Sequence, residues 1–484
     1  MPATPRGTRA STSTSASTST RASTTNAPVR VALLGCGNVG AAVAEQLGAR
    51  AAEIATRTGV RLELAGVAVE HPELERRATI DPSLLTDDAK GLVERPDVDV
   101  VVELIGGLDP ARTLVESALR AGKPVVTANK VLLAQAGAEL AEIASDNAVD
   151  LLYEAAVGGA IPVIRPLRES LAGERVLRVM GIVNGTTNYI LTRMTEESLD
   201  YAEALAEAQR LGLAERDPTA DVSGADAAAK AAILAALAFG SDVLGTTVER
   251  EGITQIRAVD VAHARRLGYV IKLLAIAELV EGGPDLSVRV HPAMVPGDHP
   301  LASVRGPFNA IFVEGEACGE LMLYGRGAGG TPTASAVLGD LIDASRNLRA
   351  GAHTPAPHRA PATVRPSGDL YSAFYIRLDV RDEPGVLAAV AASFGRHDVS
   401  IRAMEQDGMG GEARLVFLTH LARQGSVSET LADLRRIESV GRVGTLLRVI
   451  GPDDAPRLHV PTAIAPVQLR DAPGAGLGPR WPQR

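Results

Sequence analysis

Cysteine, lysine and an excess of positive charge are what this sequence of 484 residues lacks. Two cysteines, Cys36 and Cys318, are too few for a disulfide framework or a zinc site, and they fit a reducing cytoplasm. The formal net charge of −9 argues against the basic surface that binds nucleic acid or an anionic membrane. No uninterrupted apolar run approaches the roughly 18 residues that a membrane-spanning helix requires. We therefore expect a cytoplasmic protein whose partners are small molecules, with no nucleic acid and no membrane among them.

Lysine is the rarest of the charged residues. Only five of the 49 basic side chains are lysines, and they are Lys90, Lys123, Lys130, Lys230 and Lys272. Arginine cannot release a proton near neutral pH, whereas a partly buried lysine can. Each lysine is therefore a candidate for a position that needs a compact charge or a transferable proton.

The composition also indicates domain boundaries, and the length allows two to four domains. Residues 1–27 are mainly Ser, Thr, Ala and Arg and predict a disordered arm, because they offer nothing to bury; an organelle transit peptide is the alternative. Pro- and Gly-rich stretches predict a linker at 350–368 and a loose tail at 452–484. The domains are expected at 28–152 (with 331–349 packing back on it), at 153–330 and at 369–451.

A glycine-rich turn follows the first apolar run. Val29–Leu34 reads as a strand, the turn Gly35-Cys-Gly37-Asn38-Val39-Gly40 follows, and a helix-favouring stretch begins at Ala41. In this strand–turn–helix context the glycines allow a tight turn, close approach to a pyrophosphate and close packing of helix on strand. The phosphates would lie at the helix N-terminus. The pattern predicts a dinucleotide site, and a turn without a ligand is the alternative.

Strand-like and helical segments alternate after this turn, which predicts a parallel α/β sheet of the Rossmann type. Ligands collect at the carboxyl ends of such strands, and four segments lie there: Glu70, Gly106-Gly107, Thr127–Lys130 and Glu154. Glu70 would hold a ribose 2′-OH and favour NAD, whereas Arg76 and Arg77 would hold a 2′-phosphate and favour NADP. The sequence leaves this choice open, with a slight preference for NADP.

Four carboxylates lie within twelve residues in the middle of the chain, at Glu215, Asp217, Asp221 and Asp226. Lys230 follows Asp226 by four residues, so the two side chains share one face of a helix. Such a pair is either a surface ion pair that stabilises the helix by a few tenths of a kcal/mol or part of a charged site. Asp217 precedes a proline and is expected to cap or turn the chain.

Seven motifs occur in an order that resembles the homoserine dehydrogenase family. They are Gly35–Gly40, Glu103–Gly107, Thr127–Lys130, Tyr153–Pro162, Gly181–Asn188, Leu211–Lys230 and Tyr324–Ser335. The resemblance is to the monofunctional form with a C-terminal ACT domain. It implies NAD(P)-linked interconversion of aspartate 4-semialdehyde and L-homoserine, a step of threonine, methionine and isoleucine biosynthesis. Two positions depart from the family pattern, since Arg216 and Arg326 stand where prolines are usual.

The resemblance also implies roles for individual residues. Lys230 would be the proton donor, Lys130 would lie near the nicotinamide and substrate, and Asp226 would hold and aim the lysine. Glu215 would bind the substrate ammonium, with Asp221 as a weaker candidate for substrate contact. The remaining implied ligands of the dinucleotide are Gly106, Gly107, Gly212 and Gly327, together with Lys130 and the first glycine turn.

The segment Tyr153–Pro162 resembles the family's site for a monovalent cation. Glu154 and the carbonyls of Val157, Gly159 and Ile161 would hold sodium or potassium, because oxygen-only ligands suit a hard cation. The alternative for Glu154 is a polar group that ends a strand. The following Asn184–Asn188 segment is expected to cap a helix that starts at Thr186 or Asn188.

The C-terminal residues 369–451 read as strand–helix–strand–strand–helix–strand, which resembles an ACT domain. That family binds small amino acids at the loop after its first strand, where Asp382, Gly385 and Val386 stand here. Threonine is the effector that the resemblance implies, and a ferredoxin-like domain without a ligand is the alternative. Because the domain is expected to be a separable module, we predict that deletion of residues 369 onward keeps activity. A homodimer or homotetramer is expected from the resemblance alone.

Two rival hypotheses keep the fold and change the function. An oxidoreductase of the same fold would act on a different amino-acid aldehyde. An amino-acid sensor would carry an inactive dehydrogenase body. The presence of Lys130, Glu215, Asp226 and Lys230 together argues against the sensor.

Overall fold

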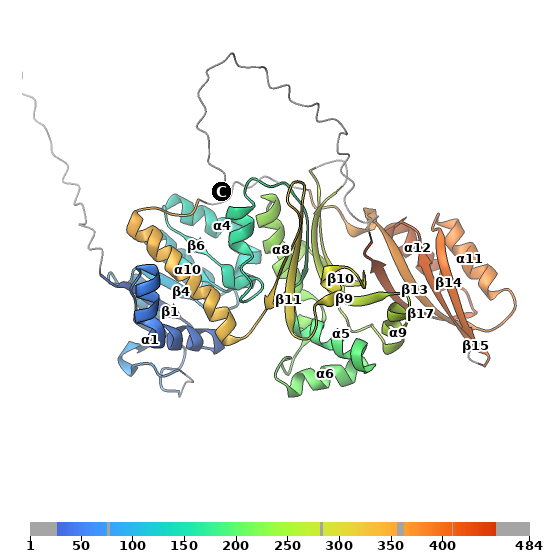
Figure 1. The fold of residues 1–484 in the computed structure, drawn as a ribbon, viewed down its shortest axis with the longest axis horizontal. Helices are drawn as coiled ribbons and strands as arrows, with labels where there is room; N and C mark the ends of the chain where they lie inside the picture. Colours follow the sequence, from blue (N-terminus) through green and yellow to red (C-terminus); the bar gives the residue numbers. More distant parts are fainter. Residues whose placement is uncertain (1–26, 75–77, 281–283, 356–362, 409, 452–484) are drawn as a thin grey trace, which may run out of the picture.

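The computed structural model describes residues 27–74, 78–280, 284–355, 363–408 and 410–451. Three parts follow one another along the long axis of the molecule: a parallel sheet with its helices, a mixed sheet, and a C-terminal α/β unit (Figure 1). The arm predicted at residues 1–27 lies, except for its last residue, outside the described chain, as do the tail at 452–484 and Arg76 and Arg77.

The first part is a six-stranded sheet in the order β3-β2-β1-β4-β5-β6, with every pair parallel. Its strands are β1 (Val29–Leu34), β2 (Leu62–Ala68), β3 (Leu85–Thr86), β4 (Val100–Glu103), β5 (Val125–Thr127) and β6 (Leu151–Leu152). The strand order reverses between β1 and β4, and this is where doubly wound sheets bind dinucleotides. The predicted Rossmann-type sheet is confirmed.

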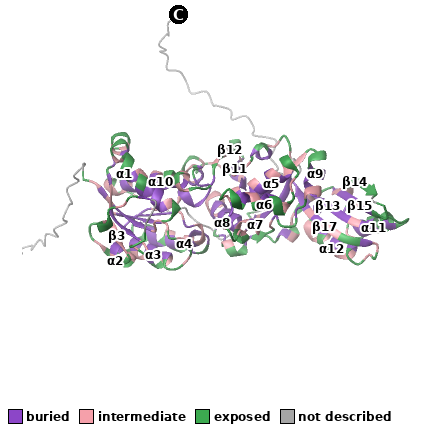
Figure 2. Ribbon diagram, turned by 90° about the horizontal axis from the view of Figure 1, so that it is seen from below, coloured by how far each residue is buried: buried purple, intermediate pink, exposed green. Residues whose placement is uncertain are grey.

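Helices cover both faces of this sheet, as its mainly apolar, buried strands require. One face carries α1 (Asn38–Thr58) and α10 (Gly330–Ala350), and the other carries α2 (Ala89–Glu94), α3 (Ala111–Arg120) and α4 (Lys130–Asp146). The strands lie buried between the two layers (Figure 2). α10 comes from far along the chain, so the polypeptide leaves this part after β6 and returns to it at Gly330.

The middle and C-terminal parts share one sheet of eleven strands. Its main path is β12-β11-β7-β9-β10-β17-β13-β15-β14. The middle part supplies β7 (Val176–Ile182), β9 (Tyr269–Leu279), β10 (Leu286–Pro296), β11 (Phe308–Gly315) and β12 (Gly319–Arg326), with β8 (Glu249–Arg250) beside β10. Its helices are α5 (Gly185–Glu197), α6 (Tyr201–Arg210), α7 (Thr219–Val222), α8 (Ala225–Phe239) and α9 (Ala258–Arg266).

The C-terminal part has the predicted βαββαβ order. Its elements are β13 (Tyr371–Arg381), α11 (Val386–Arg396), β14 (Ile401–Gly408), β15 (Glu412–Thr419), α12 (Gln424–Leu434) and β17 (Val440–Val449). Its last strand, β17, pairs in parallel with β10 through Ala293–Arg448 and Met294–Val449. Tyr375, Val416 and Leu447 belong to the same hydrophobic core as helix α8, so this part is not an appendage.

The segment Asn184–Asn188 differs from its prediction. Helix α5 begins at Gly185 and its N-cap is Asn184, whose side chain accepts the N–H of Thr187. Asn188 is instead buried inside the first turn and donates to the carbonyls of Gly306 and Phe308 at 2.9 and 3.1 Å. Its side-chain oxygen accepts a hydrogen bond from Lys272 at 2.9 Å.

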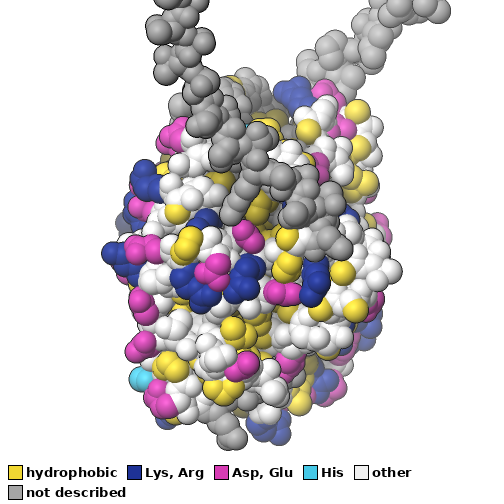
Figure 3. All heavy atoms as spheres, turned by 90° about the vertical axis from the view of Figure 1, so that its left-hand side faces the viewer, with side chains coloured by type: hydrophobic (Ala, Val, Ile, Leu, Met, Phe, Trp, Pro, Cys, Tyr) yellow, Lys and Arg dark blue, Asp and Glu magenta, His cyan; other side chains and the backbone are white. Residues whose placement is uncertain are grey.

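Among the described residues no helix is long and apolar enough to cross a membrane. Figure 3 looks onto the end formed by the parallel-sheet part, where acidic and basic side chains are interspersed.

Lys272 on β9 gives a test of the buried core. Burial lowers the pKa of Lys272 to about 8, with Arg305 acting in the same direction. Between about pH 8 and pH 10.4 the unfolded chain therefore holds the proton more tightly, and the free energy of unfolding rises with pH, at a slope of about 1.4 kcal/mol per pH unit. Lys272→Met should flatten this rise in urea unfolding at pH 8 and pH 10. Lys90→Met replaces an exposed lysine and should leave the rise of the unfolding free energy with pH unchanged. An equal rise in the wild type and in both variants would contradict the assignment of the lowered pKa to Lys272.

The sequence predicts that deletion of residues 369 onward keeps activity, but the shared sheet leads to the opposite expectation. Deletion would expose β10 and would leave the buried carboxylate of Asp260 without Arg377, Tyr375 and Thr445, its partners at 2.8, 3.3 and 2.7 Å. Deletion would also expose to water the hydrophobic core that Tyr375, Val416 and Leu447 share with α8, at a cost of about 25 cal/mol per Å² of apolar surface. The structure predicts that the truncated chain has a clearly lower melting temperature and loses soluble activity. A truncated chain that melts with the full chain would show an independent module.

Candidate active site

One buried carboxylate, that of Asp226, joins two lysines from different parts of the molecule. Its Oδ1 lies 2.7 Å from the Nζ of Lys130, and its Oδ2 lies 2.7 Å from the Nζ of Lys230. Lys230 also donates to the carbonyl of Val183 at 2.7 Å. Asp226 and Lys230 are each only 8% exposed, so the surface ion pair that their spacing allowed is excluded. The site therefore lies between the parallel sheet and the mixed sheet.

Helix ends fix these three groups. Lys130 is the first residue of α4, and the side chain of Asn129 caps that helix by accepting the N–H of Leu132. Asp226 is the second residue of α8, which begins directly after Gly224, a residue with a left-handed φ of 81°. Lys230 stands one turn later on the same face of α8. Because the first turn of a helix favours a carboxylate, the position of Asp226 is itself electrostatically favourable.

The charges in the site stabilise one another. Burial by itself would raise the pKa of Asp226, but the charges of Lys230 and Lys130 and their hydrogen bonds hold that pKa well below its usual range. Burial acts to lower the pKa of Lys130, but Asp226 first, and then Asp221 and Glu215, outweigh it and raise that pKa. Asp226 is therefore ionised at neutral pH.

Asn184 completes the cluster, and the sequence did not single it out. Its side-chain amide donates to Asp221 at 2.7 Å and to Asp226 at 3.0 Å, while its oxygen caps α5. Asp221 is thereby brought into contact with the site, as its role as a candidate substrate ligand requires. The sequence does contain a signal for Asn184, because Asn184 and Thr187 have the Asn-x-x-Thr spacing of an N-cap. The prediction instead placed the start of the helix at Thr186 or Asn188.

The rest of the acidic segment is more exposed. Glu215 lies at the surface of the cluster, near enough for its charge to act on Lys130. Gln209 donates to the carbonyls of Glu215 and Arg216 at 3.1 and 3.4 Å, so the loop is held although Arg216 stands where a proline is usual. Asp217 accepts from the backbone and hydroxyl of Thr219 and only turns the chain.

The glycine turn after β1 has the geometry that its sequence predicts. Gly35 has φ of 92° and lies so close to the backbone of Leu104 that a Cβ would meet its oxygen at 2.7 Å. A Cβ on Gly40 would overlap the carbonyl of Gly35. Gly37 is the N-cap of α1 and has open space beside it, so Asn38 and Val39 begin the helix at the mouth of the turn.

A second buried carboxylate, Glu103, organises the neighbouring strand end. It accepts the N–H groups of Ile105 and Gly106 at 2.8 and 3.1 Å and the hydroxyl of Thr127 at 2.6 Å. Gly107 offers its carbonyl to Asn129 at 2.7 Å. Gly106 and Gly107 both have left-handed φ and open space beside them. Glu103 thus links the glycine pair to the helix that presents Lys130.

The determinants of cofactor choice are only partly described. Glu70 is exposed and lies two residues beyond the end of β2. Its rivals Arg76 and Arg77 fall outside the described residues.

The Glu154 carboxylate has a structural role in the described chain. It accepts the N–H groups of Val163, Ile164 and Arg165 at 2.5, 2.7 and 2.9 Å and so caps the following helix. The chain turns at Gly158 and Gly159, both left-handed, so the carbonyls of Val157, Gly159 and Ile161 lie on one short loop. The carboxylate accepts three N–H groups and has room for one further contact. Together with the three carbonyls it offers a cation only oxygen ligands. These residues fit a monovalent cation, and none of the described residues forms a cluster of His, Cys, Asp or Glu for a transition metal.

Gly327 lies at the crossing from β12 to α10. A Cβ there would overlap the side-chain amide of Asn309, and a Cβ on Gly159 would meet the carbonyl carbon of Gly327 at 2.6 Å. Close packing therefore requires glycine at both positions. The guanidinium of Arg326, which stands where a proline is usual, lies over the ring of Phe308, 5.4 Å from its centroid. Gly212 ends α6 with a left-handed φ of 70°.

The three predicted effector residues lie together in the C-terminal part. Gly385, with φ of 89°, is the N-cap of α11, and Val386 is the first residue of that helix. The backbone N–H of Asp382 donates to the carbonyl of Gly411 at 3.1 Å, while its side chain remains exposed. The loop thus presents an exposed carboxylate beside a helix N-terminus.

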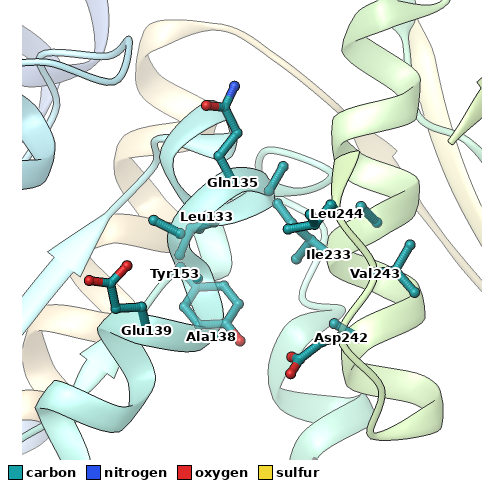
Figure 4. Close-up of a pocket in the computed structure, with 14 residues that line it drawn as sticks. Leu133, Gln135, Ala138, Glu139, Tyr153, Ile233, Asp242, Val243 and Leu244 are labelled. Atoms are coloured by element: carbon teal, nitrogen blue, oxygen red, sulfur yellow. The ribbon is translucent and has the colours of Figure 1, made fainter. Parts of the chain in front are cut away.

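A cavity of about 140 Å³ opens between α4 and α8, farther along the two helices than Lys130 and Lys230. Figure 4 shows Leu133 and Tyr153 facing Ile233, Val243 and Leu244 across it, with Glu139 and Asp242 at its edge. Its lining does not include the three charged groups of the site. The two helices therefore meet at their charged N-terminal ends and are less tightly packed beyond them.

Comparison with known proteins gives consistent matches along the chain. Residues 35–154 match the family model for the NAD binding domain of homoserine dehydrogenase, residues 162–342 match the homoserine dehydrogenase model, and residues 374–439 match the ACT domain model. A homoserine dehydrogenase of Mycobacterium bovis is 51% identical over 434 residues, which cover 88% of this chain and 98% of the relative.

Solved structures agree with these matches. The crystal structure of a homoserine dehydrogenase from Thiobacillus denitrificans superposes with a TM-score of 0.81 at 39% identity, covering 88% of this chain and 98% of that one. A hyperthermophilic archaeal homoserine dehydrogenase mutant in complex with NADPH has a TM-score of 0.56 at 30% identity, covering 66% of this chain and 98% of that one.

Proposed function

The chain belongs to the homoserine dehydrogenase family of NAD(P)-dependent oxidoreductases, and we propose that Lys230 is the group that exchanges a proton with the substrate oxygen. One observation carries the proposal: the carboxylate of Asp226 lies between Lys130 and Lys230, at 2.7 Å from each. Two ammonium groups, one from each part of the molecule, thus flank a single carboxylate beside the N-terminus of α4.

In the direction of reduction, the bound NAD(P)H supplies a hydride to the aldehyde carbon. Charge then develops on the aldehyde oxygen and requires a proton. Lys230 transfers a proton from Nζ to that oxygen, which completes the alcohol and leaves a neutral amine, and the amine regains a proton from solvent. Asp226 and the carbonyl of Val183 hold Lys230 in place, since both accept its N–H groups. Lys130 adds positive charge beside the developing oxyanion.

The carboxylates on the exposed side would bind the substrate ammonium. Glu215 and Asp221 both lie near enough to Lys130 to affect its pKa. Asp221 is held by Asn184, whereas Glu215 is free to adjust to a ligand in its exposed loop. We assign Glu215 as the main ammonium ligand and Asp221 as a second one.

Substitution of Lys230 tests this function. Lys230→Met should lower kcat about 10²- to 10⁴-fold, the range for loss of a general acid, because the methionine side chain cannot supply the proton of Nζ. Asp226→Asn should also lower kcat, since both lysines lose their partner. The measurement is oxidation of NAD(P)H with aspartate 4-semialdehyde and with a panel of other aldehydes, with Lys90→Met as the matched control. Wild-type kcat in Lys230→Met, or turnover with other aldehydes only, would refute the assignment.

For the nucleotide we propose NADP as the preferred form, supported by Arg76 and Arg77 in the sequence and by the NADPH complex of the archaeal relative. The residues implied are those of the turn Gly35–Gly40, with Gly106, Gly107, Lys130, Gly212 and Gly327. KM values for the two nucleotides test this preference.

We also propose a sodium or potassium ion on the carbonyls of Val157, Gly159 and Ile161 beside Glu154. Rates measured in sodium, potassium and tetramethylammonium buffers test whether the ion is bound.

Threonine is the effector we propose for the C-terminal part, with Asp382 binding its ammonium beside the N-terminus of α11. Asp382→Asn should raise the threonine concentration for half-inhibition about tenfold, equivalent to about 1.4 kcal/mol. Glu383→Gln, at the adjacent exposed residue, should have no effect. Equal effects of the two substitutions, or inhibition by other amino acids alone, would contradict the proposal.

A second copy of the chain is the proposed partner of the middle part. Strand β12 is the edge of the eleven-stranded sheet, and it exposes Leu321, Met322 and Tyr324. Unpaired edge strands with apolar side chains are covered in stable proteins. We propose a homodimer, or a homotetramer built from it, in the cytoplasm; light scattering of wild type and Leu321→Asp checks the assembly.

A further inference from the structure

A short segment between α8 and α9 wraps the turn that separates Asp221 from Asp226. The N–H of Ile253 donates to the carbonyl of Val222 at 2.9 Å. A Cβ on Gly252 would overlap that same carbonyl, and a Cβ on Gly224 would meet the carbonyl of Glu251 at 3.4 Å. The backbone of residues 251–253 therefore lies directly against the backbone of residues 222–224. Movement of one requires movement of the other.

The C-terminal part holds this segment through an ion pair. Arg448 on β17 is almost fully buried, and its Nη2 lies 2.7 Å from Oε1 of Glu251. Its Nε donates to Gln424 of α12 at 2.9 Å. The N–H of Glu251 donates to the carbonyl of Val290 at 2.8 Å, which fixes the segment to β10. The side chain of Glu251 is about half exposed, so it pairs with Arg448 at the edge of the interface.

A second contact follows a few residues later. The hydroxyl of Thr445 on β17 lies 2.7 Å from the carboxylate of Asp260 and 3.1 Å from the carbonyl of Gln255, and it shares its one hydrogen between them. Arg377 of β13 donates to the same carboxylate. The segment from Glu251 to Asp260 is thus attached to two strands of the C-terminal part. Its other side is attached to the turn before α8.

We propose that Glu251 and Arg448 are positioning residues for the substrate site, through which the C-terminal part sets the placement of Asp221. The pair fixes residues 251–253, these fix the turn 222–224, and the turn determines how Asp221 meets Asn184. The proposal rests on the function assigned above to Asp221, Asp226 and Lys230. It predicts that loss of the pair changes substrate binding rather than proton transfer.

Two variants of Glu251 test this. The Glu251 side chain is half exposed but Arg448 is buried, so Glu251→Ala removes the ion pair of a buried guanidinium, whereas Glu251→Gln keeps an acceptor for it. Glu251→Ala should raise KM for homoserine about fivefold, within the range for residues that couple two sites, with kcat changed less than about twofold and KM for NADP unchanged. Glu251→Gln, which keeps an acceptor for Arg448, should restore most of the wild-type KM. The melting temperature of each variant shows whether it is still folded at the temperature of the assay.

The matched control is a second ion pair between the same two parts. Arg266 of α9 pairs with Glu405 of β14 but does not contact the turn 222–224. Glu405→Ala should leave both KM values unchanged. Equal KM values for homoserine in Glu251→Ala and Glu405→Ala would overturn the proposal, as would a fall in kcat without a rise in KM. Full activity in Lys230→Met would instead overturn the proposed function, so the two failures are distinguishable.

Discussion

The buried carboxylate of Asp226 is the constraint on which the arrangement of this molecule depends. It is almost fully buried and must be paired, because an isolated charge there would cost several kcal/mol. Its two cationic partners come from different parts, Lys130 from the parallel-sheet part and Lys230 from the helix of Asp226 itself. Docking of the two parts and completion of the charged cluster are therefore one event. A dehydrogenase gains from this because nucleotide and substrate are then bound in a fixed relation.

Local sequence patterns accounted for the elements that depend on near neighbours. The strand–turn–helix around Gly35 and the Asp226–Lys230 spacing follow from backbone sterics and helix period, and both are present in the structure. Asn184 could not be found in this way. Its importance comes from contacts with Asp221 and Asp226, some forty residues distant, and its capping pattern overlaps with those of Thr186 and Asn188. Glu103 stood in a family motif without a predicted role, and its bond to Thr127 forms only when β4 pairs with β5.

The C-terminal part shows what composition cannot reveal. Its βαββαβ order was readable, because each helix and strand has its own period. The way in which this part attaches to the rest of the molecule could not be read from the sequence. A Pro-rich stretch indicates a connection but carries no information on which strands pair. The parallel pairing of β17 with β10 involves only two residue pairs, and the buried Asp260 is neutralised by groups more than a hundred residues away. The C-terminal part is therefore connected to the turn before α8 through the pair of Arg448 with Glu251 and the hydrogen bond from Ile253 to Val222.

The return of α10 to the parallel sheet has a mechanical consequence. The chain crosses between the two catalytic parts twice, after β6 and at Gly327–Gly330, and the two crossings touch where Gly159 lies against Gly327. Two covalent links that meet at one contact hold the two parts at a fixed separation near Gly159 and Gly327. The ion pair of Lys130 with Asp226 joins the same two parts again at the site.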